Sequence, residues 1–140
     1  MIWLVRVYLF LMSFVYVLIG GWAILDPLAS ALDLGWPSFM DAIGLSVKSE
    51  IGYSEIAGIY GGLNLCIGLM CLVGIFKENI GTFSVKVITF LVGSIALGRM
   101  LFSLLPTTPT FYNTYFIFEI SAFTIGILLL YFYKKLNQTT

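Results

Sequence analysis

Four long apolar stretches dominate this sequence, and each is long enough to cross a lipid bilayer as a helix. Residues 7–25 and 56–76 carry no charged side chain, and residues 83–105 and 111–133 carry few. A membrane-spanning helix needs about 20 mostly apolar residues at ~1.5 Å per residue. Because a backbone in hydrocarbon must satisfy its own hydrogen bonds, we expect all four stretches to be helical.

The composition is typical of a membrane protein rather than a soluble one. The chain has 140 residues, of which 60% are hydrophobic and 10% are charged, whereas soluble domains carry about 25% charged residues. The mean hydropathy is +1.03. Seven basic and seven acidic residues cancel, so no nucleic-acid partner is expected. We therefore predict one all-α transmembrane domain covering residues 1–140.

Charged residues and prolines set the predicted helix ends. Asp26-Pro27 is expected to end the first helix, because the residue before a proline is disfavoured in the α region. Short loops after the second and third helices predict an up-down-up-down four-helix bundle. The predicted helices cover residues 2–25, 51–76, 83–105 and 111–133.

The basic residues predict the orientation of this bundle. Arg6, Lys77, Lys86, Lys134 and Lys135 fall at one end, and the opposite end holds mainly acidic residues. Because cytoplasmic segments are enriched in Lys and Arg, we expect both termini in the cytoplasm. The predicted location is the cell inner (cytoplasmic) membrane, crossed several times.

The first connector, residues 27–50, is the longest predicted segment outside the spans. Phe39, Met40, Ile43 and Val47 recur at helical spacing within it. This pattern indicates a short helix lying on the outer membrane surface. A simple surface connector is the preferred interpretation, and a lid over the outer end of the bundle is the alternative.

Three charged residues lie inside the predicted spans. Glu55 lies about one turn into the second helix, and helix rise places Arg99 and Glu119 roughly 9 and 12 Å below the same surface. A lone charge in a span costs ~2.5–3.5 kcal/mol on insertion scales, so such residues face the bundle interior and pair. Because the planar fork of arginine binds two carboxylates, we predict Arg99 between Glu119 and Glu55.

Other residues are expected around this cluster. Tyr60, Asn64 and Tyr115 would complete a hydrogen-bonded network. Small residues recur at helical spacing from both acids, including a G-x-x-x-G, and such residues let helices approach closely. The predicted packing positions are Gly58, Gly62, Ser94, Gly98, Ala122 and Gly126.

The polar cluster has three open interpretations. The first is an ion network that fixes helix register. The second is a pocket for a small ligand, a lipid headgroup or an ion from the outer leaflet. The third is part of a proton or ion pathway. A pathway needs polar groups on the cytoplasmic side, yet residues 65–76 and 120–133 carry no charge. The structural interpretation is therefore preferred, and the pathway is the least favoured.

The sequence lacks the residues that most catalytic and metal sites need. It has no histidine, which removes the commonest general base and metal ligand. Cys66 and Cys71 are five residues apart on one predicted helix, so they lie on different faces and cannot pair. No zinc spacing or phosphate-binding loop is present. We expect no enzymatic activity, no metal site and no cofactor.

Short motifs resemble two families. Glu55-Ile-Ala-Gly-Ile-Tyr-Gly-Gly62, Ala96-Leu-Gly-Arg99 and Phe118-Glu119 resemble a bacterial group of small four-helix membrane proteins known as a domain of unknown function. This resemblance covers nearly the whole chain and implies a four-helix membrane fold. That group often has an arginine before the alanine-glycine run, where this chain has Ile56 and Ala57. The second-helix motif is distantly similar to DoxX-like membrane proteins, some of which are tied to quinone or thiol redox systems.

The sequence thus predicts a non-enzymatic membrane protein that serves as an accessory or packing subunit of a larger membrane complex. Its expected partners are membrane lipid and either other membrane subunits or further copies of itself. The alternative function is a binding or transport module for a small molecule, lipid or quinone, with the polar cluster as its pocket.

Overall fold

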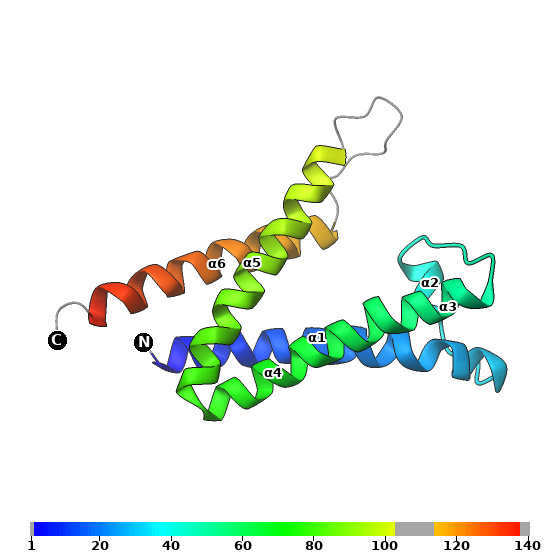
Figure 1. Cartoon of the computed structure of the whole chain (residues 1–140), viewed down its shortest axis with the longest axis horizontal. Helices are drawn as coiled ribbons and strands as arrows, with labels where there is room; N and C mark the ends of the chain where they lie inside the picture. The colour runs from blue at the N-terminus through cyan, green and yellow to red at the C-terminus, as the bar shows by residue number, and fades with distance from the viewer. Residues whose placement is uncertain (1, 103–113, 138–140) are drawn as a thin grey trace. The chain divides into compact units, whose positions relative to one another are not determined.

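The computed structural model describes residues 2–102 and 114–137, and over these residues every element is helical. Four helical stretches are long and apolar enough to cross a membrane, namely Ile2–Ser30, Ile51–Phe76, Glu78–Phe102 and Thr114–Lys135. This confirms the prediction of four helices that are long and apolar enough to span a membrane. The elements, shown in Figure 1, are α1 (Ile2–Ala31), α2 (Phe39–Ala42), α3 (Glu50–Ile56), η1 (Ala57–Leu63), α4 (Asn64–Phe76), α5 (Glu78–Phe102) and α6 (Thr114–Asn137).

The chain forms two compact units. Unit 1 comprises Met1–Val7 and Gly74–Thr140, and unit 2 comprises Tyr8–Val73. Unit 1 therefore contains α5 and α6, and unit 2 contains most of α1 and α4 together with the connector between them. A single domain with up-down-up-down topology stays a prediction.

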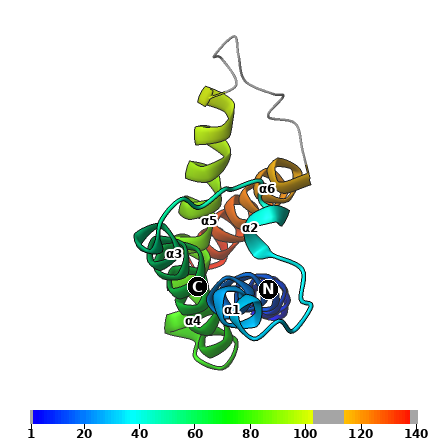
Figure 2. The same ribbon diagram turned by 90° about the vertical axis from the view of Figure 1, so that its right-hand side faces the viewer.

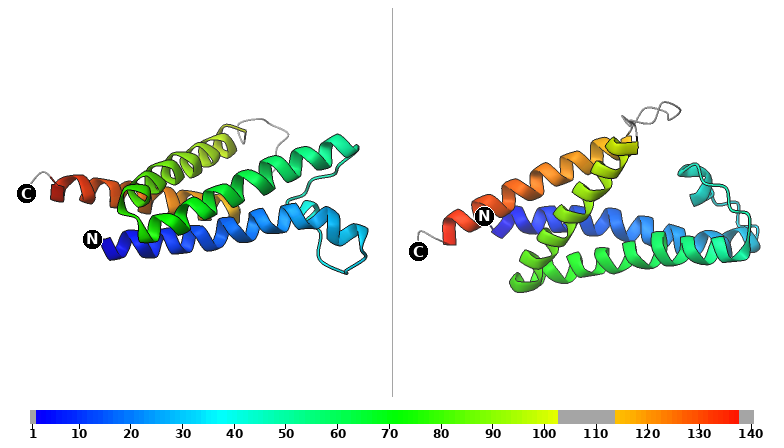
Figure 3. Two further views of the ribbon diagram at one scale, coloured as in Figure 1. Left: turned by 60° about the horizontal axis from the view of Figure 1, so that its bottom comes forward. Right: turned by 45° about the horizontal axis from the view of Figure 1, so that its top comes forward.

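In unit 2, α1 and α4 run antiparallel and approach closely through glycines. A Cβ atom at Gly20 would lie 2.9 Å from the carbonyl oxygen of Gly61, and one at Gly68 would lie 2.8 Å from the backbone nitrogen of Val17. Residues later in α1 meet residues earlier in the second span, so the two helices run in opposite directions. Figure 3 shows the two helices side by side in both views. The contact requires glycine because no side chain fits between the backbones.

A π-helical turn interrupts the second span. The segment η1 covers Ala57–Leu63 between α3 and α4, and the side-chain amide of Asn64 donates a hydrogen bond of 2.6 Å to the carbonyl of Tyr60 at its end. A π-helical turn contains about one residue more than an α-helical turn. Residues before and after η1 therefore do not share the faces that α-helical counting assigns to them.

The prediction that Asp26-Pro27 ends the first helix at residue 25 is wrong. Helix α1 continues through Pro27 to Ala31, and the chain then turns at Asp33, which has a φ of 50°. A proline inside a helix removes one backbone hydrogen bond and costs about 3 kcal/mol, so other contacts have to offset the continuation of α1 through Pro27. Here the buried carboxylate of Asp26 binds the connector, as described below, and this holds the turn in place.

The connector contains less helix than its pattern predicted. Between the end of α1 at Ala31 and the start of α3 at Glu50, only Phe39–Ala42 is helical, as α2, and Val47 lies outside any helix. The hydroxyl of Ser38 caps α2 by accepting a hydrogen bond from the backbone N–H of Asp41 at 3.4 Å. The predicted interfacial helix is therefore reduced to a single turn.

In unit 1, α5 and α6 run antiparallel. Arg99 near the end of α5 contacts Glu119 near the start of α6, and Glu78 at the start of α5 contacts Tyr133 near the end of α6. Helix α5 begins five residues before the predicted start at residue 83, and α6 extends past the predicted end at residue 133. The other predicted ends, 105 and 111, lie outside the described residues.

Two of the six predicted packing positions are buried within their own unit. Ala122 and Gly126 are buried, and a Cβ atom at Gly126 would meet the side chain of Thr89 on α5. The other four predicted positions are exposed, and they are not the points where α1 meets α4 or α5 meets α6. These four are Gly58, Gly62, Ser94 and Gly98.

We predict that Gly20→Ala destabilises unit 2 by ~1–3 kcal/mol, because the added methyl group overpacks the contact with Gly61. Gly21→Ala is the matched control, since nothing lies within 4 Å of a Cβ atom there. The control should be neutral or gain up to ~1 kcal/mol from helix propensity. Denaturant unfolding in detergent measures both variants, and equal effects would contradict the close approach.

Candidate functional site

An ion pair joins the two helices of unit 1 inside their apolar stretches. The Nε–H of Arg99 donates to both carboxylate oxygens of Glu119, at 2.8 and 3.0 Å. The side chain of Glu119 is 8% exposed and that of Arg99 is 37% exposed. Two members of the predicted cluster, Arg99 and Glu119, are therefore in direct contact.

The antiparallel arrangement of α5 and α6 favours this pair electrostatically. Arg99 lies in the last turn of α5, where the partial negative charge of the helix end attracts a cation. Glu119 is the sixth residue of α6 and lies in its second turn, beyond the first turn over which the helix-end charge acts. The helix end therefore stabilises Arg99, and Glu119 relies on the arginine itself.

The guanidinium of Arg99 also lies over an aromatic ring. Its Cζ atom is 5.7 Å from the ring centre of Tyr115, a distance at which the ring face attracts a cation. The contact that Tyr115 makes with Arg99 is through its ring. Because Glu119 binds only Nε, the terminal nitrogens of Arg99 have no hydrogen-bond partner among residues 2–102 and 114–137. These N–H groups are donors, so a ligand for them would need acceptor oxygens.

The remaining predicted members of the cluster belong to unit 2. Glu55 is exposed on α3, and the amide of Asn64 binds the carbonyl of Tyr60 within its own helix. The ring of Tyr60 lies 5.8 Å from the ring of Phe39. Contacts of these three residues with Arg99 stay predictions.

Sequence reasoning missed a buried carboxylate in unit 2. Asp26 on α1 is 5% exposed, and its oxygens accept hydrogen bonds from the backbone N–H of Phe39 at 3.0 Å and from the hydroxyl of Ser38 at 3.5 Å. A buried charge is tolerated when it is hydrogen-bonded in this way. The contact ties α2 to α1, and Figure 2 shows the ribbon of α2 near that of α1.

Aromatic contacts strengthen the same junction. The ring of Phe39 is 2% exposed and lies 5.4 Å from the ring of Trp22 in an edge-to-face arrangement. The indole N–H of Trp22 donates to the carbonyl of Pro37 at 2.9 Å. The available sequence signal was the four-residue spacing of Trp22 and Asp26, which places both on one face of α1.

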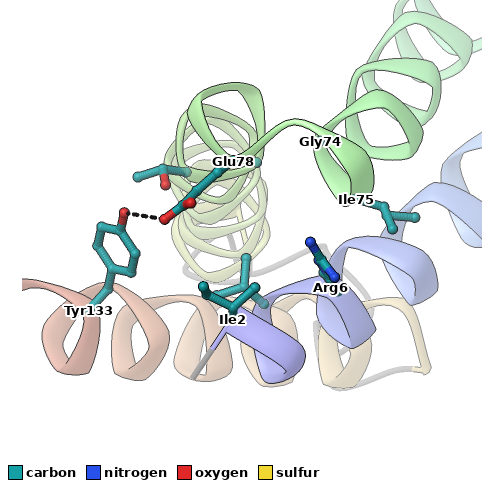
Figure 4. A pocket seen from close by; sticks show the side chains of 9 residues that line it. Ile2, Arg6, Gly74, Ile75, Glu78 and Tyr133 are labelled. Carbon is teal, nitrogen blue, oxygen red and sulfur yellow. Dashed lines mark hydrogen bonds between the residues drawn. The ribbon is translucent and has the colours of Figure 1, made fainter. Parts of the chain in front are cut away.

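A small cavity lies at the opposite end of unit 1 from Arg99. It measures about 30 Å³ and is lined by residues that include Ile2, Arg6, Glu78 and Tyr133. Figure 4 shows the hydroxyl of Tyr133 donating to Glu78 at 3.2 Å, with Arg6 on the far side of Ile2 from Tyr133. A cavity of this size holds about one water molecule. It is too small for an organic ligand.

The described residues contain few other side chains that could bind a metal ion or act as a nucleophile. Within residues 2–102 and 114–137, no three His, Cys, Asp or Glu side chains gather closely enough to hold a metal ion. Cys66 is exposed and Cys71 is buried, and neither forms a disulfide. The strongest candidate site is therefore the Arg99–Glu119–Tyr115 cluster.

Comparisons of this chain with protein-family models, with curated proteins and with solved structures find no match. The two resemblances seen in the sequence accordingly stay predictions.

We predict that Arg99→Leu lowers the free energy of unfolding by ~3 kcal/mol, because it leaves the buried carboxylate of Glu119 without its cation. This is the low end of the range for a broken buried pair, since the arginine is partly exposed. The double variant Arg99→Leu/Glu119→Leu removes both charges and should recover most of the loss. Unfolding in detergent gives both values, and a stable single variant would show that the pair does not hold α5 to α6.

Proposed function

We propose that this protein is a non-enzymatic, multi-pass membrane protein that acts as an accessory or packing subunit of a larger membrane complex. Four stretches long and apolar enough to cross a membrane support this proposal. Residues 31–50 are the only described stretch of more than two residues outside those spans. Contacts with partners would therefore be made mainly within the membrane.

The observation that carries the proposal is the open helix face that each unit retains. In unit 2, Gly58 and Gly62 are exposed, and Ile59 beside them is 55% exposed. In unit 1, Ser94 and Gly98 are exposed. Small residues on a membrane helix allow the close approach of another helix. These faces have the composition of a helix–helix interface but take no part in the α1–α4 or α5–α6 contact.

A second function is favoured by the open N–H groups of Arg99. In this alternative the cluster of Arg99, Glu119 and Tyr115 binds or transports a small molecule, lipid or quinone. Carboxylate, phosphate and quinone oxygens are all acceptors for guanidinium donors. The loss of a co-purified ligand in Arg99→Lys, which keeps the charge and removes the planar fork, would support this function.

We also propose that the protein resides in a bacterial inner membrane with both termini in the cytoplasm. The basic residues of unit 1 support this orientation, since Lys77 and Lys134 both lie at the helix ends where Glu78 meets Tyr133. Cytoplasmic segments near spans are enriched in such residues.

We expect the protein to purify in mild detergent with a stoichiometric partner, either another membrane subunit or a further copy of itself. Gly58→Leu should reduce the bound partner tenfold or more, because overpacking an interface costs ~1–3 kcal/mol. Gly21→Leu is the control, since the Cβ position is equally open at both glycines. Mass spectrometry of the intact complex measures the stoichiometry. A wild-type protein that is monomeric and partner-free would contradict the accessory role.

We expect a cysteine introduced at Lys134, in a chain with Cys66 replaced by Ser, to react with a membrane-impermeant maleimide only after the cytoplasmic side is opened. Lys134 lies near the end of α6 and is exposed. Labelling of intact cells or right-side-out vesicles would reverse the proposed orientation.

A further inference from the structure

Lys86 is a charged residue well inside α5. Helix α5 begins at Glu78, so Lys86 lies roughly 12 Å along it at the rise of an α-helix. The uncharged stretch between Lys86 and Arg99, residues 87–98, spans only about 18 Å. The hydrocarbon core of a bilayer is about 30 Å thick. The two charges therefore cannot both lie outside hydrocarbon unless the bilayer becomes much thinner.

The two basic residues of α5 differ in their partners. Arg99 binds Glu119 on α6, whereas Lys86 is exposed and has no ion pair or hydrogen bond among the described residues. A charged residue at membrane depth marks a functional site by default, because its desolvation has to be offset by some partner. The partner of Lys86 has to come from the surroundings of unit 1.

An open apolar groove begins at Lys86. It is shallow and open to its surroundings, and its lining residues Lys86, Val87, Phe90, Leu91 and Ser94 are all on α5. The ring of Phe90 is 79% exposed. The hydroxyl of Ser94 donates to the carbonyl of Phe90 at 2.8 Å, so its polar group is satisfied within the helix. The surface beyond Lys86 is accordingly apolar.

From this arrangement we infer that the groove binds one anionic phospholipid from the leaflet on the Glu78 side. The phosphate binds the ammonium group of Lys86, and an acyl chain lies along Phe90 and Leu91. A single cation at the head of an apolar groove matches an anion at the head of a hydrocarbon chain. Lysine also directs its ammonium toward the headgroups while its stem stays in hydrocarbon.

The shape of this face favours a lipid over a helix of another protein. Close helix approach in membranes uses small residues, but the protruding Phe90 would hold a second helix away from α5 at this level. A flexible acyl chain adapts to such a ring. The groove and the small residues proposed as a packing face on α5 therefore serve different purposes, although Ser94 borders both.

The test is native mass spectrometry of delipidated protein titrated with dioleoyl phosphatidylglycerol or dioleoyl phosphatidylethanolamine. Wild type should bind one phosphatidylglycerol with a clear preference over phosphatidylethanolamine. Lys86→Gln should weaken that binding roughly fivefold, the factor expected for one cation near a membrane surface. Lys86→Arg should retain it. Lys134→Gln is the control, because Lys134 is also a basic, exposed residue of unit 1.

Equal phosphatidylglycerol binding by wild type and Lys86→Gln would overturn the inference, as would an equal loss in Lys134→Gln. Glycerol phosphate that binds as well as the lipid would show that the groove plays no part. A protein partner cross-linked through position 90 in place of lipid would also overturn it.

If Lys86→Gln does not fold, Phe90→Ala tests the groove instead. Its control is Phe14→Ala, because the ring of Phe14 is also exposed. Only the former should weaken lipid binding.

Discussion

The Arg99–Glu119 ion pair is the interaction on which unit 1 depends. Lipid offers no water to either charge, so each needs a partner supplied by the protein. Arg99 lies in the last turn of α5 and Glu119 in the second turn of α6, so the antiparallel arrangement of the two helices brings the charges together. Farther along the same helices, Gly126 lies against Thr89. The same constraint leaves Lys86, the other basic residue of α5, in need of a partner.

Unit 2 relies on close backbone contact rather than on charge pairing between its spans. Gly20 allows α1 to reach the carbonyl of Gly61, and dispersion forces favour such tight packing in a solvent that offers no hydrophobic effect. At the end of α1, the carboxylate of Asp26 holds the first turn of α2. The connector is therefore attached to the spans by buried contacts, in contrast to a free surface loop.

Hydropathy predicted the four spans because the cost of a polar backbone and of charges in lipid acts on every residue of a span. The pairing of Arg99 with Glu119 followed from the same cost. The packing face of the second span could not be predicted in this way. Counting by α-helical spacing from Glu55 pointed to Gly58 and Gly62, whereas the contact with α1 uses Gly61. The starting point of the count accounts for this difference, since Glu55 is itself exposed and lies on the exposed face with Gly58 and Gly62. The continuation of α1 past Pro27 likewise depends on the distant connector, which local sequence rules do not include.

The pair of Arg99 and Glu119 can be observed in the protein embedded in lipid bilayers. Solid-state NMR measures it through the dipolar coupling between ¹⁵Nε of Arg99 and the carboxylate ¹³C of Glu119. We expect a clear coupling, because Nε lies 2.8 and 3.0 Å from the two carboxylate oxygens. If a folded, bilayer-embedded sample lacks this coupling, the ion pair does not join α5 to α6.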